Sequence, residues 1–467
     1  MRMGLRHALP AEDRLALEQL SERVPRCAKG DFRFLTRARA GCPLYNRGME
    51  SSRRSFFQSL PVMAALPASW TAFTGALRAA TAPDANNEAY WSLVKRQFPL
   101  EDNLVYLNAA NVCPASRPVL DRHAEFMRDF QANPSFQNRA KYETMRERLR
   151  EKIGAMLRVS GDEIAITRNT SEGTNIVVKG VELKPGDEVL ITDHNHPSNN
   201  DSWKVRAQRE GFTVKSLPVR VPAASRDELI SQIEKAVTPR TKVIAVTHVT
   251  STTGIMYPAK EIAAIAQKRG IWMHLDGAQS FAVLDVNLKE IGCDSYSASA
   301  HKWLMGPLEA GILYVRADRV PQVWPSIVTA GWTDHLKGAR KLEVYGQRDD
   351  PRIVALEAAI DFVSLIGVKT VESRARMLAS SMKEQISQIG GVKLKTNLEP
   401  ELSGGVVKCD IARVPTKQAY DALWEKHRVS IAMTASGDSQ GLRFSPHIYN
   451  SREDVERAVA GIRALAG

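Results

Sequence analysis

Two short stretches of the chain decide its fold: His274-Leu275-Asp276-Gly277-Ala278-Gln279 and, shortly after it, Ser299-Ala300-His301-Lys302-Trp303. Each stretch ends or follows an apolar run that is typical of a buried strand, Ile271–Leu275 for the first and Ser295–Ala298 for the second. In an open α/β sheet, ligands bind beyond the carboxyl ends of the strands. The two stretches therefore predict such a sheet, with a ligand site that contains a carboxylate and a lysine.

Strand and helix patterns alternate along the middle of the chain, which favours a mainly parallel sheet covered on both faces. The predicted strands are Ile164–Thr167, Glu188–Thr192, Lys242–Thr247, Ile271–Leu275, Ser295–Ala298 and Gly311–Val315. The predicted helices include Lys141–Leu157, Ser171–Lys179, Asp201–Arg209 and Ala259–Lys268. The pattern changes near residue 350, where longer helices and short strands predict a smaller α+β domain.

Two further strand ends carry polar groups. Asn169-Thr170-Ser171 follows the strand Ile164–Thr167 and opens a helix, and His194-Asn195-His196 follows Glu188–Thr192. A helix N-terminus binds phosphate through its free backbone N–H groups, and the two hydroxyls add further donors. The sequence therefore predicts a phosphate site at Thr170 and Ser171.

Lys302 by itself is most simply explained as a solvated surface lysine. Next to Asp276 it suggests a different chemistry, because a desolvated lysine forms an imine with a carbonyl compound. A pyridine cofactor also needs a carboxylate that keeps its ring nitrogen protonated, and Asp276 at the neighbouring strand end is suited to this. The combination predicts pyridoxal 5'-phosphate held as a Schiff base on Lys302.

These motifs resemble the class V aminotransferase and cysteine desulfurase superfamily of fold type I pyridoxal phosphate enzymes. The Asp276–Gln279 and Ser299–Trp303 segments have the order and spacing of that family, and Asn169–Asn175 and His196–Asn199 match further family segments. The resemblance covers roughly residues 100–460 and implies the fold type I architecture. It also implies a homodimer with the cofactor between the subunits, where residues 329–332 reach the partner's phosphate.

The resemblance assigns a role to each candidate residue. Lys302 is the imine lysine, Asp276 the partner of the pyridinium nitrogen, and His196 the residue that stacks on the ring. Gln279 bonds the ring hydroxyl, and the phosphate ligands are Thr170, Ser171, Ser299 and His301. Two simpler interpretations stay open: His196 as a turn residue before Pro197, and His301 as a strand cap.

The segment Gly441–Asn450 matches the family region whose arginine binds the substrate α-carboxylate, which makes Arg443 the substrate ligand. A guanidinium grips a carboxylate with two parallel hydrogen bonds, although a structural salt bridge is the alternative explanation. The form of this segment and the run Tyr345–Asp349 look most like the isopenicillin N epimerase branch. That branch often has another aromatic residue where His196 stands.

The absence of a cysteine shortly before Arg443 limits the reactions that the sequence supports. Desulfurases of the family carry a reactive cysteine shortly before the substrate arginine, but here His427–Met433 contains none. The shared first step is removal of the α-proton by Lys302, which gives an α-carbanion. Epimerisation, transamination and β-elimination all remain open, so the predicted enzyme is a class V transaminase or epimerase of an amino acid or peptide-borne amino acid. The alternatives are a thiol-independent carbon–sulfur lyase and a periplasmic siderophore-tailoring enzyme.

The N-terminal region is interpreted as a targeting signal. Ser52-Arg53-Arg54-Ser55-Phe56-Phe57 resembles the twin-arginine export motif, followed by an apolar stretch and by small residues ending at Ala82. An amphipathic helix with two chance arginines is the alternative. We expect residues 1–48 to be an upstream extension before Met49, 49–82 the signal, 83–350 the large cofactor-binding domain with an N-terminal arm, and 351–467 the small domain. The predicted destination is the bacterial periplasm, reached through the twin-arginine machinery.

Other function classes are disfavoured. The net charge of +12 is partly concentrated before residue 49, where ten Lys and Arg face five Asp and Glu, and the rest alternates in sign, so nucleic acid binding is not expected. No apolar run suggests a stable membrane anchor. The five cysteines lack metal-type spacing, so no metal site is expected. Two alternative interpretations remain. The chain is a binding protein that kept the fold and lost the catalytic activity, or it is a nucleotide-binding protein, although it contains no GxxxxGK[ST] loop.

Overall fold

The computed structural model describes residues 70–79, 84–435 and 437–467. The extension 1–48 and the paired arginines of the export motif lie outside these residues. The end of the predicted signal lies inside them as α3 (Trp70–Ala79), which buries Phe73 and Leu77 in the main hydrophobic core. Phe73 stacks on Phe362 with ring centroids 5.6 Å apart. Cleavage near residue 82 would remove these contacts.

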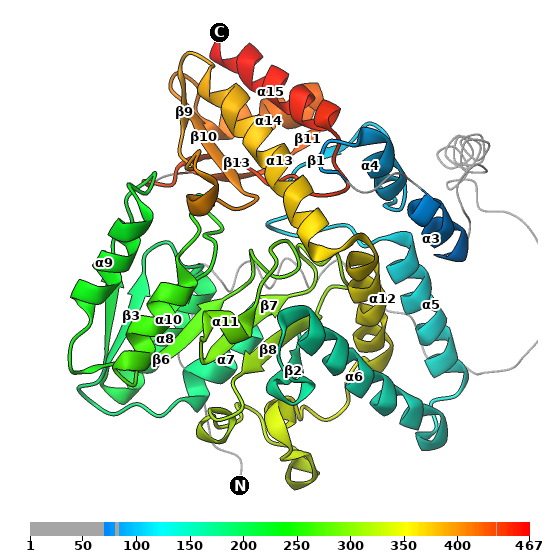
Figure 1. Cartoon of the computed structure of the whole chain (residues 1–467), viewed down its shortest axis with the longest axis vertical. Helices are drawn as coiled ribbons and strands as arrows, with labels where there is room; N and C mark the ends of the chain where they lie inside the picture. Colours follow the sequence, from blue (N-terminus) through cyan, green and yellow to red (C-terminus); the bar gives the residue numbers. More distant parts are fainter. Residues whose placement is uncertain (1–69, 80–83, 436) are drawn as a thin grey trace, which may run out of the picture. The chain divides into compact units, whose positions relative to one another are not determined.

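A seven-stranded sheet forms the centre of the larger part, in the order β2-β8-β7-β6-β5-β3-β4 (Figure 1). Four of its neighbouring pairs are parallel, and β8 runs antiparallel to both β7 and β2. The predicted α/β class with a mainly parallel sheet is confirmed. The strands are β2 (Ile164–Thr167), β3 (Glu188–Thr192), β4 (Thr213–Leu217), β5 (Thr241–Thr247), β6 (Trp272–Asp276), β7 (Ser295–Ser299) and β8 (Gly311–Val315).

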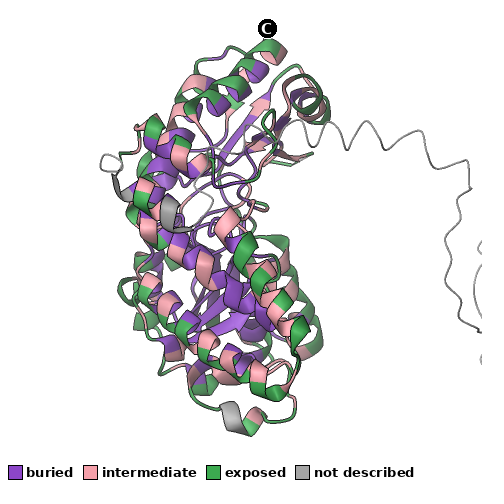
Figure 2. Ribbon diagram, turned by 90° about the vertical axis from the view of Figure 1, so that its right-hand side faces the viewer, coloured by how far each residue is buried: buried purple, intermediate pink, exposed green. Residues whose placement is uncertain are grey.

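Both faces of this sheet are covered because successive side chains of a strand point to opposite faces. On β3, Val189 and Ile191 pack with Trp203 of α8, while Leu190 between them belongs to the core on the other face. Figure 2 shows the buried strands between helices that are exposed on their outer sides. The helices of this part are α4 (Glu88–Lys95), α5 (Arg117–Ala132), α6 (Phe136–Leu157), α7 (Thr170–Gly180), α8 (Pro197–Glu210), α9 (Arg226–Ala236), α10 (Ala259–Lys268), α11 (Leu288–Ile291) and α12 (Asp350–Ile366).

A second, antiparallel sheet lies in the C-terminal part, in the order β12-β13-β10-β9, and helices pack on one of its faces through a separate hydrophobic core. Its strands are β9 (Val392–Leu394), β10 (Val407–Ile411), β12 (Ala432–Thr434) and β13 (Gly441–Phe444), and its helices are α13 (Val368–Ser387), α14 (Thr416–His427) and α15 (Arg452–Ala466). The short strands β1 (Val105–Tyr106) and β11 (Val429–Ser430) pair in parallel. The predicted boundary between the large and the small domain at residue 350 stays a prediction. The helix that begins there, α12, packs on α5 and α6 of the larger part.

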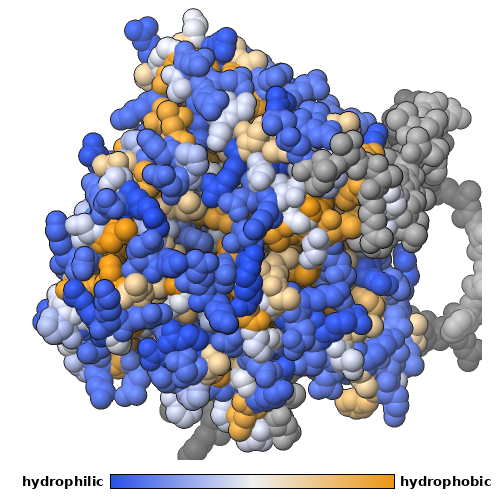
Figure 3. Space-filling view, viewed as in Figure 1, coloured by the Kyte–Doolittle hydropathy of each residue, from blue (hydrophilic) through white to orange (hydrophobic). Residues whose placement is uncertain are grey.

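The surface face in Figure 3 is mostly hydrophilic, with apolar residues scattered across it. Among the described residues, no helix combines the length and the apolar character that crossing a bilayer requires.

Candidate active site

Three strands of the large sheet end at one edge, where they position the candidate residues. Asp276 is the last residue of β6, and Ser299 is the last residue of β7. Thr170 begins α7 just after β2, which runs in the same direction as β7 because both are antiparallel to β8. The predicted convergence of polar strand ends is therefore present in the fold.

The proposed phosphate end is built around Thr170. Its backbone N–H donates to Ser299 Oγ at 2.8 Å, and the two hydroxyls lie 2.7 Å apart. Nδ1 of His301 is buried without a hydrogen-bond partner in the described part, and burial lowers the pKa of this ring to about 4. The Ser171 hydroxyl makes no hydrogen bond to these groups in the described residues. A helix N-terminus with two hydroxyls and an unpaired ring nitrogen suits a phosphate.

Asp276 is a buried carboxylate with few partners. Only 2% of the residue is exposed, and Oδ1 accepts a hydrogen bond from the Ala278 N–H at 3.0 Å. Burial raises its pKa, while that hydrogen bond and the charges of Lys302 and His196 act in the opposite direction. It forms no ion pair with any described residue, so a cationic ring nitrogen would supply the charge that this carboxylate lacks.

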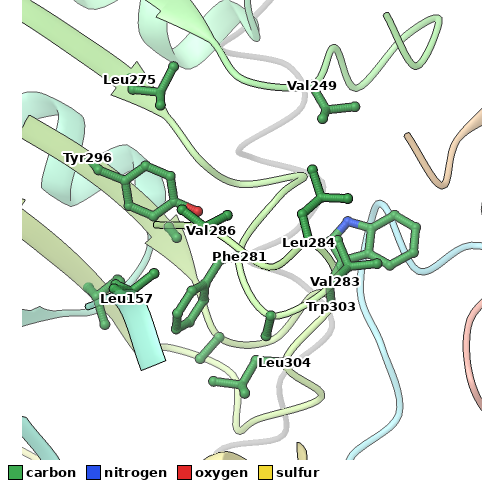
Figure 4. Close-up of a cluster of buried hydrophobic side chains, with 14 of the residues drawn as sticks. Leu157, Val249, Leu275, Phe281, Val283, Leu284, Val286, Tyr296, Trp303 and Leu304 are labelled. Carbon is green, nitrogen blue, oxygen red and sulfur yellow. The ribbon is translucent and has the colours of Figure 1, made fainter. Parts of the chain in front are cut away.

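Lys302 follows β7 and is half-buried, and the residues after it fix its backbone. Trp303 and Leu304 are buried in the apolar cluster of Figure 4, and the Met305 N–H donates to the Lys302 carbonyl at 2.8 Å. Burial lowers the pKa of the Lys302 ammonium; Asp276 opposes this shift and Arg443 adds to it. A lowered pKa makes the free amine available as a nucleophile and as a proton acceptor.

Gln279 is buried and already hydrogen-bonded. Its Oε1 accepts from Trp303 Nε1 at 2.7 Å, and its Nε2 donates to the Ala110 carbonyl at 2.9 Å. One amide N–H therefore remains for the ring hydroxyl that the resemblance implies.

His196 caps the N-terminus of α8, where its Nδ1 accepts from the Ser198 N–H at 3.2 Å. The residue as a whole is exposed. Loss of surrounding water lowers its pKa first, and the positive charges of Lys302 and Arg443 lower it further. The cap explains the residue structurally, and because it uses only Nδ1, it is compatible with stacking of the ring on a ligand.

Arg443 lies on β13 and reaches the loops of the large sheet. Its guanidinium donates to the Ser251 carbonyl at 2.9 Å and to Asn108 Oδ1 at 3.0 Å, while Nε is buried without a partner. No carboxylate of the described residues pairs with it, so the alternative of a structural salt bridge is not observed. Burial lowers its pKa to about 10. An unpaired, partly desolvated guanidinium is the group expected to bind a carboxylate.

Three residues at the site were not predicted from the sequence. Asn108 and the Ser251 carbonyl orient Arg443, and the Cys113 N–H donates to the carbonyl of His301, the neighbour of Lys302, at 2.7 Å. Cys113 and Asn108 belong to a turn that follows β1. The available signal was the position of this turn directly after the apolar run Leu104–Leu107.

The sheet and its site define a class of protein: the fold is that of fold type I pyridoxal phosphate enzymes. Residues 105–458 match the sequence model of the family described as Aminotransferase class-V. The isopenicillin N epimerase of Amycolatopsis lactamdurans is 30% identical over 400 residues, and the match covers 80% of this chain and 98% of that protein. A probable cysteine desulfurase of Methanothermobacter thermautotrophicus is 27% identical over 401 residues, 80% of this chain and 98% of that protein. The chain belongs to the class V aminotransferase family.

Solved structures show the same fold. The cysteine desulfurase CsdA from Escherichia coli has a TM-score of 0.72 at 23% identity and covers 80% of this chain and 98% of its own. A variant of C-DES with glycine linked covalently to its PLP cofactor has a TM-score of 0.72 at 22% identity, with 78% and 98% coverage.

Pyridoxal phosphate is the cofactor of this family, and the residues present fit it. Asp276 offers a carboxylate with no cationic partner, His301 an unpaired nitrogen, and Lys302 an amine with a lowered pKa. The chain is therefore a class V pyridoxal phosphate-dependent enzyme.

Proposed function

We propose that this enzyme acts at the α-carbon of an amino acid or a peptide-borne amino acid and inverts its configuration, as an epimerase. The observation that carries the α-carbon site is Arg443, a guanidinium with a buried, unpaired Nε and no carboxylate partner among the described residues. The choice of inversion is supported by the 30% identity to the isopenicillin N epimerase of Amycolatopsis lactamdurans. Its charge acts on both Lys302 and His196. A carboxylate bound by Arg443 therefore holds the α-carbon within the site that contains Lys302 and Asp276.

When bound, the cofactor supplies an electron-withdrawing ring that stabilises negative charge at the α-carbon. Arg443 binds and orients the substrate carboxylate through two hydrogen bonds. Asp276 holds the proton of the ring nitrogen in place. Lys302, whose pKa is lowered, accepts the α-proton at Nζ, and inversion then requires that a proton reach the opposite face of the α-carbon.

The three cysteines in the described part of the chain give no support to a persulfide-forming desulfurase. Cys113, Cys293 and Cys409 are buried, and burial raises the pKa of the Cys113 and Cys409 thiols to about 12 and that of Cys293 higher still. A nucleophilic cysteine is an exposed thiolate with a low pKa. The residues before Arg443 that lie on β11 and β12 contain no cysteine.

The deciding experiment incubates the holoenzyme in D₂O with a panel of amino acids and short peptides. Epimerisation predicts deuterium at the α-carbon together with inversion, independent of any added keto acid. Turnover that requires a keto acid would replace this proposal by transamination, and release of a thiol or sulfide with a keto acid product would replace it by thiol-independent carbon–sulfur lysis. Arg443→Met is expected to raise KM at least tenfold, since a charged hydrogen bond contributes about 1.5–3 kcal/mol.

We also propose twin-arginine export to the periplasm, which the motif at Arg53 and Arg54 supports. An exported enzyme of this class would act on an exported amino acid or peptide, such as a siderophore precursor. Fractionation of cells that express the full chain tests this: wild type is expected in the periplasm, and the Arg53→Lys, Arg54→Lys double variant in the cytoplasm. Equal distribution of both proteins would contradict export through this signal.

We expect a homodimer, as the family resemblance implies. Sedimentation equilibrium of the holoenzyme checks this, and a monomer mass at micromolar concentration would contradict it.

A further inference from the structure

Three cationic side chains stand in a row across the C-terminal sheet. Lys408 on β10 is directly opposite Arg443 on β13, and the Lys395 N–H at the end of β9 donates to the Lys408 carbonyl at 2.8 Å. Residues directly opposite on neighbouring strands point to the same face of a sheet. Arg443 contacts Asn108 and Ser251, so this face is the one that meets the substrate site.

Lys408 links the two strands of the β12–β13 hairpin, which carries Arg443, at the loop end. Its Nζ donates to Thr434 Oγ1 and to the Gly441 carbonyl, each at 2.8 Å. Thr434 and Gly441 are the paired residues at the loop end of β12 and β13. Lys395 holds the loop between them, donating to the Asp438 and Gln440 carbonyls at 3.0 and 2.7 Å.

No carboxylate of the described residues forms an ion pair with any member of this row. Lys408 is fully buried, with 0% of the residue exposed. A buried ammonium that is held only by neutral oxygens is expensive compared with an apolar side chain of similar size. Two such cations next to the unpaired Arg443 indicate that the site is built to receive negative charge.

We propose that Lys408 is a positioning residue of the substrate-carboxylate site, where it fixes the β12–β13 hairpin and adds positive charge behind Arg443. This inference rests on the proposed role of Arg443. Lys408 does not contact the substrate; it acts through the hairpin and through its electrostatic field.

The charge of Lys408 makes this role dependent on pH. Burial lowers the pKa of Lys408 to about 7; Arg443 on β13 and Lys395 beside β9 lower it further, and Cys409 and Asp410 on its own strand oppose the shift. A bound carboxylate favours the charged form, so carboxylate affinity is strongest below pH 7 and declines as the pH rises through 7 and Lys408 loses its proton.

Succinate tests the proposal, because it carries carboxylates and has no amine to react. Its dissociation constant is measured by calorimetry with the holoenzyme from pH 6 to 8.5, for wild type, Lys408→Met, Lys408→Arg and Arg443→Met. Lys383→Met is the matched control. Lys383 is also buried and bound only to neutral oxygens, of Asn397, Leu398 and Ser403, and has no contact with Arg443.

We expect wild-type affinity to fall roughly fivefold to tenfold across this range, from the loss of one nearby charge. Lys408→Met should bind weakly and almost independently of pH, Lys408→Arg should keep its affinity at pH 8.5, and Lys383→Met should behave as wild type. If succinate binding depends on Arg443 but its pH profile in Lys408→Met is the same as in wild type, the role of Lys408 is overturned and the carboxylate site at Arg443 stands. Binding that is absent in wild type or unaffected in Arg443→Met overturns the carboxylate site itself. If Lys408→Met does not fold, the Lys408→Arg profile decides.

Discussion

Lys302 makes no side-chain hydrogen bond or ion pair with another described residue, although Asp276 and Arg443 both act on its charge. Its ammonium is therefore free for chemistry. In Lys302→Ala we expect the cofactor to bind reversibly, without the covalent fixation that borohydride gives in wild type. Turnover should fall by about 10²–10⁴-fold, the usual contribution of a positioned proton-transfer group. Lys179→Ala, an exposed lysine on α7, is the control.

Borohydride labelling followed by peptide mapping checks this assignment. Label that persists in Lys302→Ala, or that maps to another lysine of wild type, would contradict it.

Asn108 offers a second test at the level of one side chain, because it accepts a hydrogen bond from Arg443 at 3.0 Å. Asn108→Ala removes that contact and should raise KM about threefold to tenfold with little change in kcat. Asn108→Asp places a carboxylate against the same guanidinium and should compete with the substrate, raising KM more than Asn108→Ala does. Steady-state kinetics with the substrate found in the exchange screen measures both. Equal KM values in the two variants would contradict a free Arg443.

The residues with the clearest motifs could be predicted from the sequence, and those that support them could not. Asp276 and Lys302 stand at strand ends that local periodicity identifies. Asn108 and Arg443 are separated by 335 residues, and Lys408 looks like one polar position in a short strand. Their roles arise from sheet register and loop contacts, which no local pattern contains.

At the level of elements, Gly277 shows why the turn after β6 needs glycine. A Cβ at this position would overlap Cζ of the buried Tyr296 ring. Gly277→Ala should therefore displace the ring or the backbone beside Asp276, at a cost of about 1–3 kcal/mol of unfolding free energy. Thermal unfolding of the holoenzyme measures the loss.

Gly390→Ala is the control for that variant, since nothing lies within 4 Å of the added carbon. An unfolding temperature for Gly277→Ala equal to that of the control would contradict the close packing of Tyr296.

The buried helices and strands could be predicted from the sequence, but some of the exposed ones could not. The strands β2 and β8 agree with their predicted bounds because continuous apolar runs mark them. In contrast, α5 is mostly polar and β4 is only partly buried, so neither shows a strong pattern. The predicted helix 201–209 begins earlier, at Pro197, because proline is accepted in the first turn and His196 caps it.

At the scale of the whole molecule, buried histidines connect stability to pH. Burial lowers the pKa of His248 and His447 to about 4 and that of His274 to about 3. In the unfolded chain a histidine has a pKa near 6.5. Below about pH 6.5 the unfolded chain therefore binds protons that the folded protein does not, so stability is greatest above this pH and declines as the pH falls toward 4.

The expected loss between pH 6.5 and 4.5 is on the order of 2–3 kcal/mol for each fully buried histidine, at 1.36 kcal/mol per pKa unit. Thermal unfolding at fixed cofactor concentration across this interval measures it. His447→Gln keeps a donor for the Trp303 carbonyl, which lies 2.8 Å from His447 Nε2, but cannot titrate, so its unfolding temperature should fall less steeply with decreasing pH. His427→Gln, at the end of α14, should follow the wild-type curve. A wild-type unfolding temperature that stays constant from pH 6.5 to 4.5 would show that these histidines charge without unfolding the protein.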